Sequence, residues 1–188
     1  MRWFGRSKVV DEANNPKIVY HGTTKGFDVF QTRKRNPELG FHFGSVSQAE
    51  WFATYDEARG TLPGGNIRPV YLRIEHPLRM PDIFVRSVHS TETALYWLYR
   101  EGLVCKPDCA NVCRARSARD AHTRLAELIE ALGYDGIVYK NDQEGGPADS
   151  NEDSYAVFWL DQIRSAFEFD NRYLTSDWKK SLVCGSSQ

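Results

Sequence analysis

The chain has 188 residues, of which 41% are hydrophobic and 26% are charged, and its formal net charge at pH 7 is −1. This length suits a single domain with a sizeable core, and the composition is that of an ordinary soluble globular protein. A net charge this close to zero argues against a strong nonspecific affinity for nucleic acid or for an anionic membrane, and local basic patches stay open. No apolar run approaches the roughly 18 residues of a membrane span, and residues 1–6 lack the apolar stretch of a secretory signal. We therefore expect a cytoplasmic protein, and delivery as an effector without a cleaved signal stays open.

The first two expected strands both carry a histidine that glycine follows. Lys17–Tyr20 is an apolar strand that leads into His21, and residues 22–26 are expected to form a loop. The second strand, Phe41–Phe43, contains His42 and ends at a glycine. Two histidines presented from two strand ends, each with a glycine after it, are typical of a site rather than of a core.

The segment between these strands is aromatic and then basic. Phe27 and Phe30 are three residues apart, which favours hydrophobic anchors beneath a loop over ligand contacts. Arg33 and Arg35 lie in the expected loop over residues 31–39. Their charges are either solvated or hold an anionic ligand, because arginine complements phosphate.

A helix with aromatic residues is expected after the second strand. Ser45 is a candidate N-cap for a helix over Val46–Arg59. Trp51 and Tyr55 are four residues apart and would share one face of this helix. They either pack into the core or offer a stacking surface to a ligand. The third strand is expected over Pro69–Ile74.

The second half of the chain holds two expected helices, Thr91–Tyr99 and the strongly amphipathic His122–Leu132. The proline within residues 106–108 is expected to interrupt the helical pattern, and the cysteine-containing segment that follows receives no assignment. A long acidic loop is expected over residues 141–153. The remaining expected strands are Ile137–Tyr139, Tyr155–Leu160 and Ile163–Phe169.

These elements predict an α+β domain with a central, largely antiparallel sheet or pair of sheets, because no GxGxxG or Walker turn marks a nucleotide-binding βαβ unit. We expect an N-terminal leader over residues 1–16, a single domain over residues 17–169 and a polar C-terminal tail over residues 170–188.

The four cysteines do not form a metal-binding pattern. Cys105, Cys109 and Cys113 fall at every fourth position, and Cys184 stands alone. Metal sites usually add a second cysteine pair or histidines at regular spacing. His122 and Cys184, the nearest candidates, have no such spacing, so we predict no metal. Free thiols in a reducing cytoplasm are favoured over a disulfide.

Five short motifs in order give the chain a family resemblance over roughly residues 8–166. They are an apolar strand ending in His-Gly-Thr, an aromatic strand followed by Gly-Ser, a strand before Pro-Leu, a Gly-Tyr-Asp-Gly turn into a strand, and a late strand followed by Gln-Ile-Arg-Ser. In the sequence these are residues 18–23, 40–45, 70–78, 133–139 and 154–165. The set resembles the ADP-ribosyltransferase superfamily, and most closely its phage and mobile-element (polyvalent-protein) members. The resemblance implies a split pair of largely antiparallel sheets with flanking helices.

The resemblance implies a site for NAD, whose nicotinamide–ribose bond the family breaks. The backbone of Gly22 would hold the nicotinamide amide, and His21 would hydrogen-bond the adjacent ribose, with Thr23 beside them. His42 stands where the diphtheria-toxin-like branch carries a stacking tyrosine, and it is otherwise a structural strand histidine. The other implied binding residues are Arg33 and Arg35 at the pyrophosphate, Ser45 at the strand-to-helix junction, and Trp51 and Tyr55 as a second stacking face.

The catalytic acid is the open point of the resemblance. The family carries a glutamate near the start of the late strand, and the residue just before Tyr155 is Ser154, which cannot replace it. Glu144 precedes a glycine-rich stretch and is the preferred candidate, with Glu152 as the alternative. The alternative interpretation is that the acidic side chains of this loop are solvent-exposed and have no catalytic role.

The resemblance thus implies an NAD-dependent mono-ADP-ribosyltransferase that modifies a protein or a nucleic acid, as a monomeric, phage-related toxin or effector. A toxin role would add an antitoxin or immunity protein as a partner. Two alternatives stay open on the same fold: an NAD glycohydrolase that uses water as acceptor, and a catalytically inactive NAD- or ADP-ribose-binding module.

Overall fold

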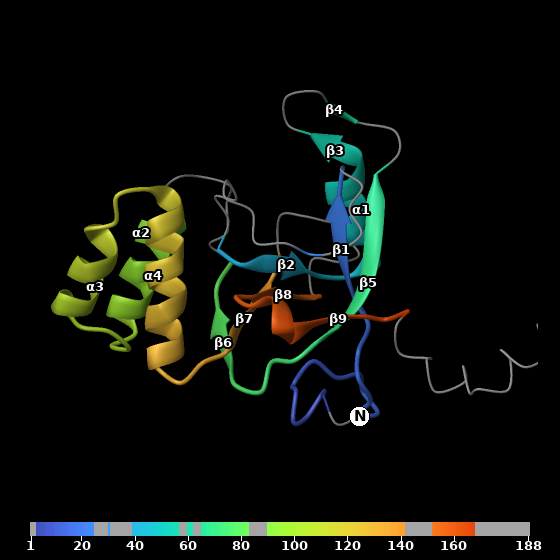
Figure 1. Cartoon of the computed structure of the whole chain (residues 1–188), viewed down its shortest axis with the longest axis horizontal. Helices are drawn as coiled ribbons and strands as arrows, with labels where there is room; N and C mark the ends of the chain where they lie inside the picture. Colours follow the sequence, from blue (N-terminus) through green and yellow to red (C-terminus); the bar gives the residue numbers. More distant parts are fainter. Residues whose placement is uncertain are drawn as a thin grey trace, which may run out of the picture.

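The computed structural model describes residues 3–24, 30, 39–56, 60–61, 65–82, 90–141 and 152–167. Within these residues the fold is α+β, as predicted, with two main sheets that run across one another and helices on either side (Figure 1). Sheet I has the order β1-β5-β9 and is antiparallel throughout. Its strands are β1 (Val19–Thr23), β5 (Asn66–Leu72) and β9 (Ile163–Ser165).

Sheet II has the order β2-β8-β7-β6. Three of its strands are antiparallel neighbours, and β6 runs parallel to β7. A separate hairpin pairs the two short strands β3 and β4. The strand bounds are β2 (Phe41–Phe43), β8 (Asp153–Val157), β7 (Gly136–Lys140) and β6 (Pro77–Met80), with β3 (Tyr55–Asp56) and β4 (Gly60–Thr61) in the hairpin.

The helices divide into two groups. Helix α1 (Val46–Thr54) lies against sheet I, whereas α2 (Ser90–Arg100), α3 (Lys106–Cys113) and α4 (Ala118–Ala131) gather on the far side of sheet II (Figure 1). A single 3-10 turn, Leu160–Gln162, connects β8 to β9. None of the helices in the described residues is both long and apolar enough to cross a membrane.

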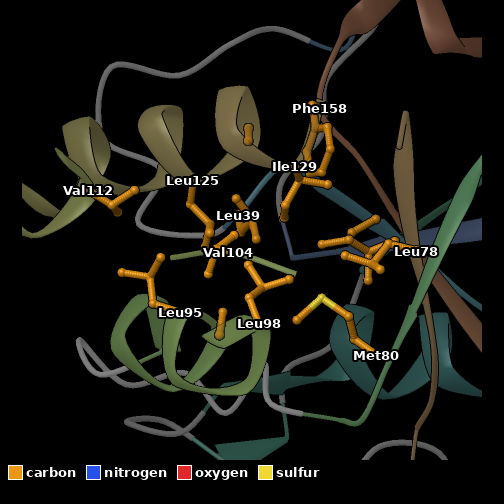
Figure 2. Packing of buried hydrophobic residues seen from close by; sticks show 14 of the residues in the cluster. Leu39, Leu78, Met80, Leu95, Leu98, Val104, Val112, Leu125, Ile129 and Phe158 are labelled. Atoms are coloured by element: carbon orange, nitrogen blue, oxygen red, sulfur yellow. The ribbon is translucent and has the colours of Figure 1, made fainter. Parts of the chain in front are cut away.

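Two apolar cores lie on the two faces of sheet II. Period-2 alternation turns Tyr155 and Val157 of β8 toward sheet I and Ala156 toward the helices. The core between the sheets also includes Val19 and Val9, so the N-terminal segment contributes to it. Figure 2 shows the helix-side core, in which Leu95 and Leu98 of α2 meet Leu125 and Ile129 of α4 and Leu78 and Met80 of β6. The apolar face predicted for the last helix is confirmed.

Two motif residues behind the family resemblance hold this fold together. The Asp135 carboxylate accepts the backbone N–H groups of Glu75 (2.8 Å) and His76 (2.7 Å), which ties the chain before β6 to the start of β7. The Gln162 side chain accepts the backbone N–H groups of Phe158 (3.1 Å) and Trp159 (3.0 Å). Each of these two side chains connects separate segments, because it accepts two backbone N–H groups that lie outside the strands.

Two sequence-based predictions about the elements were wrong, and one strand was not predicted. Residues 22 and 23 belong to β1 and not to a loop, because β1 pairs with β5 as far as Thr23. The strand that was not predicted is formed by residues 77–80, which pair in parallel with β7. The proline near residue 107 opens α3 instead of interrupting a helix. It lies in the first turn, where its missing N–H costs nothing, and Asp108 accepts the Cys105 N–H at 2.8 Å.

Candidate functional site

The two histidine strands meet where sheet I touches sheet II. Tyr20 of β1 and Gly44 exchange two backbone hydrogen bonds of 3.0 Å each. At the next residue of β1, Nδ1 of the His21 ring is 2.9 Å from the backbone oxygen of His42. A carbonyl only accepts, so His21 Nδ1 is the donor, and in the neutral ring Nε2 is then an acceptor. Neighbouring backbone therefore fixes both the orientation and the tautomer of His21.

The His21 ring lies among aromatic side chains. Its centroid is 5.3 Å from that of Phe30 and 5.6 Å from that of Phe43, and Phe30 also makes an edge contact with Phe41 at 6.0 Å. Phe30 packs against the core between the sheets, which agrees with its prediction as an anchor. Phe27 lies outside the described residues.

His42 faces the other side of sheet II. Its Nδ1 is 3.2 Å from the hydroxyl of Tyr139, and the two rings meet edge to face at 6.2 Å. Alternation along β2 places Phe41 and Phe43 toward sheet I and His42 toward the helix side. The structure thus joins the two histidines through backbone and gives their rings different neighbours.

Gly22 is required for the packing of α1 on β1. A Cβ at this position would lie 1.9 Å from the Ala49 carbonyl oxygen, far inside any real contact. The sequence analysis predicted a glycine here for another reason, namely that a ligand can approach its backbone closely. The structure adds a second reason for glycine, because helix backbone already occupies one side of it.

Ser45 caps α1, as predicted. Its Oγ accepts the Gln48 N–H at 3.3 Å, and Gln48 Oε1 accepts the Ser45 N–H at 2.8 Å, which is a reciprocal capping box. The Gln48 oxygen also accepts the Ser154 hydroxyl at 2.9 Å, and Ser154 in turn accepts Asn141 Nδ2 at 3.2 Å. Ser154, at the position where the resemblance expects an acid, is thus buried inside a polar chain that joins α1 to β8.

The shared helical face expected for Trp51 and Tyr55 does not exist. Trp51 is half-buried on α1 and meets the ring of Phe52 edge to face at 5.2 Å. Helix α1 ends at Thr54, because Tyr55 pairs with Thr61 in the β3–β4 hairpin. The two residues therefore belong to different elements, and the four-residue helical spacing does not apply to them.

The acids at the start of β8 are both held by cations. Glu152 forms an ion pair with Lys17 at 3.2 Å, and 46% of its side chain is exposed. Asp153 binds Arg79 at 2.9 Å and Lys140 at 3.2 Å. Burial alone would raise the pKa of Asp153, but the hydrogen bonds from Arg79 and Lys140 outweigh it, so the pKa lies below its ordinary value. Glu144, Arg33 and Arg35 lie outside the described residues.

The cysteines lie away from this junction. Cys105 precedes α3, Cys109 and Cys113 belong to it, and all three are free thiols. Burial raises the pKa of Cys109. Across the described part of the chain, no group of three or more histidine, cysteine, aspartate or glutamate side chains could hold a metal ion. Cys184 is outside the residues described.

Strand register brings two residues to His21 that the sequence analysis missed. His21 is directly opposite Arg68 of β5, and Thr23 is opposite Asn66. Directly opposed residues point to the same face of a sheet. The expected third strand began at residue 69 and so excluded both. The alternation of Asn66 and Arg68 with the buried Val70 was the signal that could have extended it.

The fold, with its two mostly antiparallel sheets and flanking helices, is that of the ADP-ribosyltransferase class. A model of the family described as ADP-ribosyltransferase in polyvalent proteins matches residues 11–172. The chain belongs to this family, which confirms the resemblance found in the sequence. The family normally uses NAD as its substrate. Comparisons with curated proteins and with solved structures found no match.

Proposed function

We propose that this protein is a mono-ADP-ribosyltransferase that breaks the nicotinamide–ribose bond of NAD and transfers ADP-ribose to a protein or nucleic-acid acceptor. The nucleophile of the acceptor forms a bond to the anomeric carbon of the ribose. The bond to nicotinamide breaks, and nicotinamide leaves with the electron pair. The positive charge on the ribose develops in the transition state, so the site has to orient the ribose and supply a carboxylate.

The observation that carries the proposal is the edge of β1 beside His21. In an antiparallel strand, the N–H and C=O groups of one residue point to the same side, and residues two apart share that side. Tyr20 directs both groups away from β5, toward Gly44. Gly22 therefore directs its N–H and C=O toward the same outer edge of β1. One donor and one acceptor in this arrangement match the carboxamide of nicotinamide, which presents an oxygen and an N–H group.

His21 is the proposed ribose ligand. Its Nδ1 proton is committed to the His42 carbonyl at 2.9 Å, so Nε2 of the neutral ring accepts a hydrogen bond from a ribose hydroxyl. The aromatic contacts with Phe30 and Phe43 hold the ring in place. A fixed ring loses little side-chain entropy when it binds the sugar, which is the physical advantage of a preorganised site.

The carboxylate is proposed to be Glu144, with Glu152 as the alternative. Its task is to hold a ribose hydroxyl and to take the proton from the acceptor nucleophile. The ion pair of Glu152 with Lys17 counts against Glu152, because that carboxylate would have to exchange a cation for the sugar. Asp153 is tied to two cations and has a lowered pKa, which makes it a weak base.

A second candidate function is a binding module that holds NAD without cleaving it. The observation in its favour is Ser154, which takes the place of the expected acid and is engaged by Gln48 and Asn141. An NAD glycohydrolase is the remaining alternative, because water can replace the acceptor in the same site.

One experiment separates these functions. Purified protein is incubated with NAD labelled in its adenine half, with and without a bacterial lysate, and nicotinamide, free ADP-ribose and bound label are quantified. A transferase releases nicotinamide and leaves label on macromolecules, a glycohydrolase yields only free ADP-ribose, and a binding module releases no nicotinamide. Under the proposal, Glu144→Gln and His21→Ala abolish nicotinamide release, and Ser165→Ala on β9 behaves as wild type. Equal activity of the first two variants and the wild type would refute these assignments.

We further propose that the protein acts as a phage-related toxin or effector. Its induced expression in bacteria is then expected to arrest growth, and His21→Ala is expected to relieve the arrest at equal protein level. Normal growth with active wild-type protein would count against the toxin role and leave the enzyme activity standing.

A further inference from the structure

The corner where α3 passes into α4 concentrates positive charge. Residues 109–126 contain four arginines and a single acid, Asp120, so this stretch carries a formal charge of +3, whereas the whole chain carries −1. Arg114 is the C-cap of α3, Arg116 lies in the connection, and Arg119 lies in the first turn of α4. These three side chains are exposed, and we call them the arginine corner. Their connection runs over one end of the helical group (Figure 1).

The one acid of this stretch is already neutralised. The Asp120 carboxylate forms an ion pair with Arg124 at 2.9 Å and accepts the backbone N–H of Arg116 at 2.9 Å. The hydrogen bond from Arg124, and after it the one from Arg116, hold the pKa of Asp120 below its ordinary value. Among the described residues, no carboxylate forms an ion pair with Arg114, Arg116 or Arg119. The charge of the arginine corner is therefore available to a ligand.

The stability of the fold does not explain all of these arginines. Cations stabilise the C-terminal end of a helix, so Arg114 at the end of α3 complements the helix dipole. Arg119 does the opposite, because it lies in the first turn of α4, where the dipole already supplies positive potential and acidic side chains are preferred. A cation in a position that is unfavourable for its own helix points to a role in binding.

The surroundings of the arginine corner favour a phosphate polymer over other anionic partners. No exposed large hydrophobic side chain belongs to α3, α4 or their connection, all of which lie within the described range 90–141. A protein partner would need an apolar anchor at the centre of its interface, and a membrane surface would need apolar side chains that insert into it. The planar fork of arginine binds phosphate oxygens through two parallel N–H bonds. A surface of arginines and small side chains therefore matches a ligand that is recognised by its charge, as the backbone of a nucleic acid is.

We propose that the arginine corner binds the phosphate backbone of a nucleic acid and so makes nucleic acid, rather than protein, the acceptor of ADP-ribose. Binding at the corner stands on the charge pattern alone, whereas the statement about the acceptor rests on the proposed function. A nucleic acid is a polymer, so a strand held by the helices can continue to the junction of the two sheets. With three phosphates neutralised, the logarithm of the affinity should fall with the logarithm of the salt concentration, with a slope of about −2 for a single strand.

The binding test follows the fluorescence anisotropy of a labelled oligonucleotide of about 20 nucleotides with the full-length protein, between about 50 and 200 mM salt. The double variant Arg116→Ala with Arg119→Ala is expected to bind about 10-fold more weakly at the lower salt concentration, and the magnitude of its salt slope should fall by about 1.4. The matched control, Arg6→Ala with Arg164→Ala, removes two cations elsewhere. Arg6 is 84% exposed near the N-terminus, and Arg164 stacks on Trp3 at 4.8 Å. The control should change the affinity less than about twofold, because distant surface charges are screened.

Charge reversal at Arg119 moves stability and binding in opposite directions. Glutamate in the first turn complements the dipole of α4, so Arg119→Glu should leave Tm unchanged or raise it, while oligonucleotide binding should be weaker than in Arg119→Ala. Circular dichroism checks that each variant is folded, and if one is not, the salt slope of the wild type decides.

The outcomes separate the binding surface from the function beneath it. Wild-type affinity in the double variant, an equal loss in the control, a salt slope near zero, or tighter binding of phosphatidylserine vesicles or polyglutamate than of the oligonucleotide overturns the inference. With NAD labelled in its adenine half, label should appear on the oligonucleotide, and much less of it with the double variant. Label on lysate proteins but not on a bound oligonucleotide overturns the statement about the acceptor. A wild-type protein that binds the oligonucleotide but releases no nicotinamide contradicts the proposed function and leaves the binding surface standing.

Discussion

Substitution of Gly22 by alanine tests whether β1 and α1 are packed as the structure describes. The added Cβ would lie 1.9 Å from the Ala49 carbonyl oxygen, 2.7 Å from its carbonyl carbon and 2.9 Å from its Cα. Since real contacts of this kind are at least 3.0 Å, α1 has to retreat by about 1 Å. The obstacle is helix backbone, which cannot rotate aside as a side chain could.

We expect Gly22→Ala to lower the free energy of unfolding by about 3 kcal/mol, the upper part of the range for overpacking. For a chain of this size, this corresponds to a fall of about 6–12 °C in Tm. Chemical and thermal unfolding followed by circular dichroism measures both quantities. Gly102→Ala is the matched control, because nothing lies within 4 Å of its Cβ and only its φ of +71° opposes alanine. The control should cost about 1–2 kcal/mol. If Gly22→Ala costs no more than Gly102→Ala, the packing argument is wrong.

Two further predictions concern the start of β8. Ser154→Ala removes the hydroxyl that accepts from Asn141 Nδ2 and donates to Gln48 Oε1, so two buried hydrogen bonds are lost. This should cost about 1–3 kcal/mol in urea unfolding, and a loss below about 0.5 kcal/mol would contradict the polar chain. The pKa of Asp153 is lower in the folded protein than its ordinary value of 3.8. Its ion pair with Arg79 therefore stabilises the fold at pH values above 3.8. This contribution to stability disappears as the pH falls through the pKa of the folded state. Asp153→Asn should therefore be less stable than wild type at pH 7 by about 1 kcal/mol and nearly equal to it near pH 2, and a difference that is independent of pH would refute this reading.

Local sequence patterns were sufficient to predict those elements in which buried residues recur at a regular spacing. The apolar spacing of the last helix placed Leu125 and Ile129 in the core, and Ser45 was identified as a cap from its position before an apolar run. The end of α1 was not predictable in this way. Tyr55 leaves the helix because of its pairing with Thr61, and that pairing is a contact between residues with no local signature.

The candidate site depends even more on distant pairing. His21 was recognised from its motif, but the atom that fixes its ring is a backbone oxygen of β2 and not a side chain that a motif could reveal. Arg68 became a neighbour of His21 only through the β1–β5 register. A shift by one residue would have turned it to the opposite face. Sequence patterns therefore indicated which residue types carry the chemistry, and the register decided which of them meet.

The central claim is that the β1 edge at Gly22, with His21 beside it, holds the nicotinamide half of NAD. A crystal structure of the Glu144→Gln variant with NAD tests this most directly, because slow cleavage would preserve the ligand. The account predicts the carboxamide of nicotinamide within hydrogen-bond distance of both the N–H and the C=O of Gly22, and a hydroxyl of the adjoining ribose at Nε2 of His21. A dinucleotide bound elsewhere, or a nicotinamide that makes no contact with the β1 edge, would contradict it.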